Sequence, residues 1–144
     1  MTKTITTGRF FEDFTIGQLI EHATPRTLDD GAQALYLSLY GGRFGPQSSK
    51  VFAQNMGFSD RPMDDWLVFH TIFGKSVPDI SVNAIANLGY AEGRFLAPVY
   101  AGDTLRAVST VLGMRENKNG ESGIVYVRTE GFNQMDACVL SYCR

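Results

Sequence analysis

Residues 62–75 read PMDDWLVFHTIFGK and carry the helical pattern on which the fold is expected to centre. The side chains that recur at the spacing of one helix face are Trp66, Phe69, His70 and Phe73. Pro62 suits a first helical turn, because the N–H that proline lacks would have no partner there. Leucine and isoleucine widen the apolar surface, so the pattern predicts a helix that is buried on most sides from Pro62 to about Lys75.

The segment before this helix also has a helical pattern. Apolar residues recur at helical spacing from Leu28 to about Tyr40, and a Gly-Gly pair ends the pattern. A polar loop is expected from Gly41 to Ser49, followed by a short helix from Val51 to Met56. Weak alternation over residues 17–24 predicts an early strand.

The second half of the chain changes to the period-two alternation of β-strands. Strands are predicted over residues 80–90, 103–115, 123–132 and 137–144. The sequence NKNGES at residues 117–122 is typical of a hairpin turn, because Asn-Gly adopts the backbone that tight turns need. Helices followed by a meander of antiparallel strands predict an α+β fold, with a buried helix against one sheet.

Composition limits the classes of function. The chain has 144 residues, of which 44% are hydrophobic and 19% charged, as in an ordinary globular protein of one domain. There are 13 Lys and Arg residues against 15 Asp and Glu, a net charge of −2. A protein that binds polyanions is normally basic, so the charge disfavours nucleic acid as a partner.

The sequence also bears on localisation. Its apolar stretches are short and interrupted by polar residues, so no membrane span or membrane partner is expected. The first residues lack the apolar core of a signal peptide. Cys138 and Cys143 fit neither a disulfide framework nor a zinc site, so a cytoplasmic protein with reduced thiols is expected. The last strand runs into Arg144 without a tail, which predicts a domain of a longer protein.

Several motifs resemble one known family. Residues 10–18 (FFEDFTIGQ) and 94–105 (RFLAPVYAGDTL) resemble the opening and the Gly-Asp-Thr-Leu signature of MaoC-like dehydratase domains. Three longer blocks are similar to the mesaconyl-CoA hydratase branch of that family, also called β-methylmalyl-CoA dehydratases. These blocks are residues 40–49 (YGGRFGPQSS), 64–75 (DDWLVFHTIFGK) and 87–95 (NLGYAEGRF).

The resemblance implies a hotdog fold, in which a long central helix is wrapped by a curved antiparallel β-sheet. Residues 1–144 would form a single MaoC-like hotdog domain, one half of a double-hotdog enzyme. That enzyme would be a hydratase/dehydratase, a lyase, acting on a branched enoyl-CoA such as mesaconyl-CoA or β-methylmalyl-CoA. The implied partners are the acyl-CoA thioester and a second hotdog unit, in a homodimer or in a C-terminal half. The resemblance implies no cofactor and no metal.

The same resemblance identifies two positions where this chain departs from the family. Hydration of an enoyl thioester needs a base, an acid and a group that stabilises the developing oxyanion. Related hydratases carry the loop Gly-Asp-x-Asn-Pro-x-His shortly before Phe-Ala, and its Asp and His move the protons. Counting back from Phe52-Ala53, the Asp falls on Gly42 and the His on Gln47. Neither exchanges a proton near pH 7, so the catalytic residues stay unknown and this unit is expected to shape the pocket.

The predicted substrate-binding residues are Arg43, Gln47, Ser48 and Ser49. Gln47 and the two serines offer neutral donors and acceptors for a polar acyl chain or a pantetheine amide. Arg43 suits a substrate carboxylate or a CoA phosphate. The alternatives are a loop whose polar groups are satisfied internally and an ordinary surface arginine.

Further residues have both a functional and a structural interpretation. Asp64 or Asp65 could serve an acyl-CoA thioesterase, although helix capping is the favoured interpretation. His70 could act as a base, but a hydrogen-bonded core histidine is favoured, and His22 is expected to be exposed. A non-catalytic acyl-CoA-binding or assembly domain is a third possibility.

Overall fold

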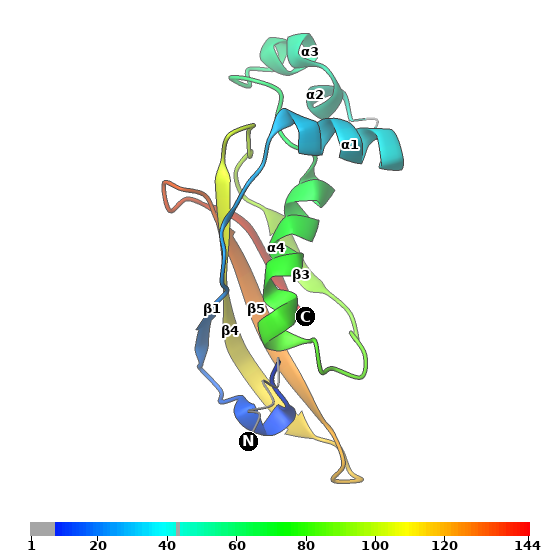
Figure 1. Cartoon of the computed structure of the whole chain (residues 1–144), viewed down its shortest axis with the longest axis vertical. Coiled ribbons are helices and arrows are strands. Elements are labelled where there is room, and N and C mark those ends of the chain that lie inside the picture. The colour runs from blue at the N-terminus through cyan, green and yellow to red at the C-terminus, as the bar shows by residue number, and fades with distance from the viewer. Residues whose placement is uncertain (1–7, 43) are drawn as a thin grey trace, which may run out of the picture.

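The computed structural model describes residues 8–42 and 44–144. The helical elements are η1 (Phe11–Asp13), α1 (Asp30–Tyr40), α2 (Gly45–Ser48), α3 (Lys50–Asn55) and α4 (Asp65–Ile80). The strands are β1 (Leu19–Glu21), β2 (Arg26–Thr27), β3 (Ala91–Phe95), β4 (Thr104–Glu116), β5 (Gly123–Phe132) and β6 (Cys138–Cys143). Helix α4 lies along the curved sheet, and α1, α2 and α3 gather beyond its N-terminal end (Figure 1).

Within the described residues, six strands form one antiparallel sheet in the order β1-β4-β5-β6-β3, with β2 also paired to β4. Residues 117–122 make the predicted hairpin turn between β4 and β5, since the Asn117 N–H donates to the Ser122 carbonyl. The alternating inward positions of β4 are all buried, and these are Leu105, Ala107, Ser109 and Val111. The α+β architecture predicted from the order of the elements is confirmed.

Helix α4 packs on the sheet through a face of aliphatic and small polar side chains. The buried residues of this face are Leu67, Val68, Thr71, Ile72 and Ser76. Ile72 lies directly over β5, because Gly131 has no side chain there. A Cβ on Gly131 would come within 2.7 Å of the Ile72 Cδ1, so the glycine permits the close approach.

The aromatic face of α4, predicted to form the core, lies on the other side of the helix. Trp66 is 58% exposed, His70 is exposed, and Phe69 and Phe73 are half-buried. The prediction was wrong for Trp66 and His70, because α4 is apolar on both faces and helical periodicity alone does not say which face meets the sheet. Phe69 and Phe73 stack at 5.9 Å between centroids and pack against the margin of the core, whereas Trp66 and His70 lie at the surface.

Two predicted boundaries differ in the structure. Helix α4 begins at Asp65 and runs to Ile80, past Pro78, instead of ending near Lys75. In this last turn, the Asp79 carboxylate lies 3.5 Å from the Arg9 Nη1 and 2.8 Å from the His22 Nδ1. The predicted strand at 80–90 is absent from the described structure, and the edge strand β3 forms instead from Ala91, where pairing with β6 begins.

Helix α1 begins after Asp29, whose side chain accepts a hydrogen bond from the Ala32 N–H at 2.7 Å. It ends at Gly41, which adopts a left-handed conformation with φ of 63°. The segment predicted as a loop from Gly41 to Ser49 contains the short helix α2. Among the described helices, none is long and apolar enough to cross a membrane.

Candidate functional site

An open pocket of about 410 Å³ lies at the N-terminal end of α4. The residues that line it are Tyr36, Tyr40, Gly42, Phe44, Gln47, Asp64, Asp65, Trp66 and Phe95. They come from α1, from the α1–α2 segment, from α2, from the start of α4 and from the edge strand β3. Aromatic walls with a few polar groups are typical of a site for a partly apolar ligand.

The two positions that the family resemblance singled out both lie in this pocket. Gly42 has no room for a side chain, because a Cβ there would overlap the Leu37 side chain and lie 3.5 Å from the Asp64 Oδ2. Gln47 is 6% exposed. An acidic side chain at position 42 would therefore need Leu37 to move, so the local packing agrees with glycine at this position.

The other predicted substrate-binding residues are placed differently. Arg43 lies outside the described residues. The Ser48 hydroxyl donates to the Phe44 carbonyl at 3.0 Å, and Ser49 caps α3 by accepting from the Phe52 N–H at 3.2 Å. Neither serine lines the pocket, so among the described candidates Gln47 alone faces it. The substrate-binding role of all four residues stays a prediction.

Two adjacent acids at the start of α4 have different environments. The Asp64 Oδ1 accepts from the Trp66 N–H at 2.9 Å and from the Leu67 N–H at 3.3 Å, so its capping role is confirmed. Asp65 makes no such cap and lines the pocket. Burial raises the pKa of the Asp65 carboxyl, the neighbouring Gln47 amide partly offsets this, and the Asp64 charge adds to it. Asp65 is thus a titratable group in the pocket, which agrees with the functional interpretation that the sequence analysis had ranked below capping.

His70 is linked to the pocket through Tyr36. Its Nδ1 lies 3.3 Å from the Tyr36 hydroxyl, while the His70 side chain itself is exposed at the protein surface. The prediction of a core histidine was therefore wrong, for the same reason as for the aromatic face of α4. Burial, with the Asp64 charge, raises the pKa of Tyr36, so its hydroxyl stays protonated and available as a donor.

A second polar group, of two ionisable residues and two hydroxyl residues, lies at the other end of α4, and we call it the His22 cluster. It consists of His22, Asp79, Ser109 and Thr129. The His22 Nδ1 lies 2.8 Å from the Asp79 Oδ2, and its Nε2 lies 2.7 Å from the Ser109 Oγ. Ser109 in turn lies 2.8 Å from the Thr129 Oγ1. His22 is 6% exposed, so the prediction of an exposed side chain was wrong.

The order serine–histidine–aspartate in the His22 cluster resembles a nucleophilic triad, but its burial does not suit catalysis. Ser109 is completely buried, so no substrate carbonyl can reach its hydroxyl. An ionised Asp79 only accepts, which assigns a proton to the His22 Nδ1 and makes Nε2 the acceptor from Ser109. Burial lowers the pKa of His22 and favours this neutral form, although the bond to Asp79 opposes the shift. The cluster therefore joins α4 to the sheet.

The pocket at the start of α4 is the better candidate site. In the described part of its lining, Asp65 is a carboxyl group with a raised pKa, and no imidazole is present. Gln47 and Tyr36 supply neutral hydrogen-bonding groups, and the aromatic rings supply apolar surface. This combination suits binding of a thioester acyl chain better than a two-residue proton transfer.

Comparisons with known proteins agree in the family that they indicate. The family model described as mesaconyl-CoA hydratase matches residues 1–144. A β-methylmalyl-CoA dehydratase from Chloroflexus aurantiacus is 61% identical over 137 residues, which cover 95% of this chain and 39% of that protein.

Two solved structures are also similar. A MaoC domain protein dehydratase from Chloroflexus aurantiacus has 59% identity and a TM-score of 0.95, over 99% of this chain and 41% of that one. A Mycobacterium tuberculosis protein with a double hotdog fold has 28% identity and a TM-score of 0.86, over 95% of this chain and 43% of that one. The predicted hotdog fold is confirmed. The chain spans about two fifths of the length of each of these relatives.

Proposed function

The chain belongs to the mesaconyl-CoA hydratase family, and from this membership we propose that it forms one hotdog unit of a hydratase–dehydratase for a branched, carboxylated enoyl-CoA. Mesaconyl-CoA and β-methylmalyl-CoA, after which the family and its Chloroflexus relative are named, are the proposed substrate and product. In hydration, the oxygen of water bonds to the β-carbon of the double bond and a proton is delivered to the α-carbon. The reverse reaction removes that proton and expels water.

We assign this unit the task of shaping the acyl-CoA pocket. The observation that carries the assignment is that Gly42 and Gln47 line one pocket, at the positions where related hydratases have the Asp and His that move protons. Neither residue titrates near neutral pH, so the Asp and His would come from a companion unit. Gln47 has the best support as a ligand contact, and Arg43, Ser48 and Ser49 remain secondary candidates.

The companion would be a second hotdog unit. Strand β3 is exposed along its whole length at one edge of the sheet. Large apolar side chains gather on α4, on β3 and on the segment between them, and those at least 43% exposed are Trp66, Val82, Ile85, Leu88, Tyr90 and Phe95. An open sheet edge beside such a surface normally pairs with another chain or domain. The second unit would be another copy of this chain or the remaining part of a longer enzyme.

This pairing has a direct test in solution. If a second copy covers the edge of β3, sedimentation analysis should give a dimer of this chain. A monomer that pairs only when a second, catalytic hotdog unit is added would assign the surface to a different domain. A monomer that pairs with neither would contradict the proposed companion.

Asp65 favours a second candidate function, acyl-CoA thioester hydrolysis. Its carboxyl lies in the pocket, and burial raises its pKa toward the range in which a carboxyl serves as an acid or base. Hydrolysis would break the thioester C–S bond with water and release the CoA thiol. The capping of α4 falls to Asp64, so Asp65 is free for such a role.

One experiment separates these functions. Mesaconyl-CoA is added to the chain alone and to the chain with a catalytic hotdog unit, while enoyl absorbance and free thiol are followed together. We expect binding without turnover for the chain alone, seen by calorimetry, and loss of enoyl absorbance once the companion is present. Hydration by the chain alone would contradict the pocket-shaping role, and thiol release would support the thioesterase. Binding without turnover in both samples would favour a non-catalytic binding domain.

A further inference from the structure

Gln33 is the one completely buried residue of α1, a helix that the structure describes from end to end. It is 1% exposed, whereas Leu35 and Leu39 on the same helix are 63% and 67% exposed. The apolar contact of α1 with the core is narrow and comes from Ala32 and Tyr36, which are only partly buried. Its place in the fold depends on an amide, whose hydrogen bonds have direction and fix position more sharply than apolar contacts do.

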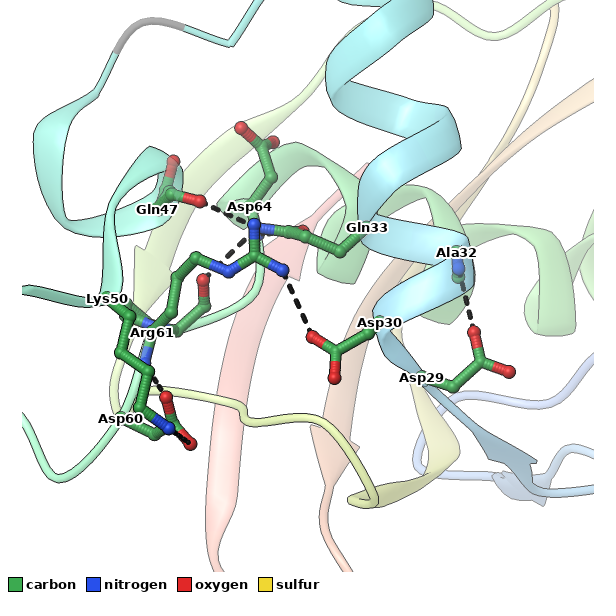
Figure 2. Close-up of polar contacts among 10 residues, drawn as sticks. Asp29, Asp30, Ala32, Gln33, Gln47, Lys50, Asp60, Arg61 and Asp64 are labelled. Atoms are coloured by element: carbon green, nitrogen blue, oxygen red, sulfur yellow. Dashed lines mark hydrogen bonds and ion pairs between the residues drawn. The ribbon is translucent and has the colours of Figure 1, made fainter.

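The Gln33 amide makes three hydrogen bonds, all to backbone atoms (Figure 2). Its Nε2 donates to the Gln47 carbonyl at 3.1 Å and to the Pro62 carbonyl at 3.2 Å. Its Oε1 accepts from the Asp64 N–H at 2.8 Å. Both amide hydrogens and the carbonyl oxygen are thus in use. We call these four residues the Gln33 cluster.

The partners of Gln33 lie on two sides of the candidate pocket. Gln47 belongs to α2, while Pro62 and Asp64 belong to the segment that enters α4. Asp64 is followed directly by Asp65 and Trp66, which line the pocket. The buried Gln33 side chain therefore connects the wall that carries Gln47 with the wall that carries the first turn of α4, in addition to the direct contact of the Gln47 amide with Asp65.

An exposed ion pair also connects α1 to the segment before α4. Arg61 reaches Asp30 of α1 at 3.0 Å, but the Asp30 side chain is 79% exposed. Exposed ion pairs contribute little, about 0–1 kcal/mol, because water screens the charges. The buried amide is thus the stronger determinant of the spacing between α1, α2 and α4.

We infer that Gln33 is a positioning residue of the pocket, which sets the distance between Gln47 and the first turn of α4 and so controls how tightly an acyl-CoA ligand is held. The identity of the ligand rests on the proposed function, whereas the positioning does not. Loss of the three bonds lets the two walls move apart, since three buried backbone groups are then left without partners.

Three variants test this role. Gln33→Met keeps the length of the side chain and removes all three hydrogen bonds. Gln33→Glu keeps its shape but has no donor while it is ionised, and it regains one donor when its carboxyl is protonated. Gln54→Met is the matched control, because Gln54 is an exposed glutamine on α3 that lies outside the pocket lining.

Trp66, the only tryptophan of the chain, lines the pocket and reports on it by fluorescence. Acrylamide quenching of Trp66 should increase in Gln33→Met and, near neutral pH, in Gln33→Glu, but not in Gln54→Met. Mesaconyl-CoA titrations followed by Trp66 fluorescence should show binding weakened by about fivefold to tenfold in the same two variants, the factor that corresponds to about one hydrogen bond.

The pH profile distinguishes positioning from a general packing role. In Gln33→Glu, quenching and affinity should return toward the wild-type values as the pH falls and the new carboxyl gains its proton. Gln33→Met should show no such recovery. If Gln33→Met does not fold, Gln33→Glu at acid pH, compared with wild type at the same pH, supplies the test.

Two results separate this inference from the proposed function. Wild-type protein that fails to bind mesaconyl-CoA would overturn the proposed function, and acrylamide quenching would still decide the role of Gln33. Folded Gln33 variants with the quenching and the ligand affinity of Gln54→Met, at every pH, would overturn the positioning role.

Discussion

The two ends of α4 are held to the rest of the fold by different chemistry. At the N-terminal end, beside the pocket, the Gln33 cluster joins an amide to three backbone groups, none of which changes its charge with pH. At the C-terminal end, away from the pocket, the His22 cluster joins ionisable side chains to hydroxyls. The Gln33 cluster thus connects the pocket walls through groups that do not titrate, whereas the His22 cluster couples stability to pH.

The largest effect is expected from His22→Ala. The change leaves Ser109 and Asp79 without their shared partner and opens a cavity, so the free energy of unfolding should fall by about 3 kcal/mol. Urea unfolding followed by circular dichroism measures the change. The control is His70→Ala, which should alter stability by less than about 0.5 kcal/mol because His70 is exposed. Equal losses in the two variants would show that the His22 cluster does not hold α4.

The next effect belongs to the N-terminal end. Asp64→Ala removes the acceptor of the Trp66 and Leu67 N–H groups and should lower the free energy of unfolding by about 1 kcal/mol. Asp64→Ser should recover most of this loss, because serine also caps helices well. The same urea titrations measure both variants. A serine variant as unstable as the alanine variant would indicate that the charge matters more than the cap.

A smaller effect is the pH dependence of stability that comes from His22. Its pKa is lowered in the folded state, from an ordinary value of 6.5, with burial as the largest cause and with Arg144 and Arg9 adding to it. Asp79 opposes the shift. The unfolded chain therefore binds the proton more readily. The contribution of His22 to the free energy of unfolding is complete above pH 6.5 and is lost as the pH falls through the folded pKa.

The comparison that isolates this effect is His22→Gln. Glutamine can donate to Asp79 and accept from Ser109, but it does not titrate. Stability measured at a series of pH values should fall less steeply in the variant than in the wild-type protein below pH 6.5. Identical pH profiles would mean that His22 does not contribute to the pH dependence.

The two histidines also show where sequence reasoning succeeds and where it fails. The strands β4 and β5 were predicted well, because strict alternation identifies the buried face without knowledge of the partner strand. His70 and His22 were assigned to the wrong environments. The exposure of each depends on which side of α4 meets the sheet, and both sides of that helix are apolar.

A similar limit applies to the edge of the sheet and to the pocket. Residues 80–90 alternate like a strand, but Ile85 is 92% exposed. This part of the chain has no partner strand in the described structure, because pairing with β6 begins only at Ala91. Motif counting brought Gly42 and Gln47 to attention, and the structure places both in the pocket. No local pattern could identify Gln33, since its three partners lie 14 to 31 residues away along the chain.

The smallest expected effect is that of Asp65→Asn. The pH dependence of stability that comes from Asp65 has the opposite sign to that from His22. Burial raises the folded pKa of Asp65 above its ordinary value of 3.8, so ionisation costs stability as the pH rises through the folded pKa. Asp65→Asn should therefore raise the free energy of unfolding near neutral pH by a few tenths of a kcal/mol, since the side chain is partly solvated and also gains from the helix dipole. Below pH 3.8 the difference should vanish, because the carboxyl is then protonated in both states. Lower stability of the variant at neutral pH would mean that the positive end of α4 outweighs the cost of burial.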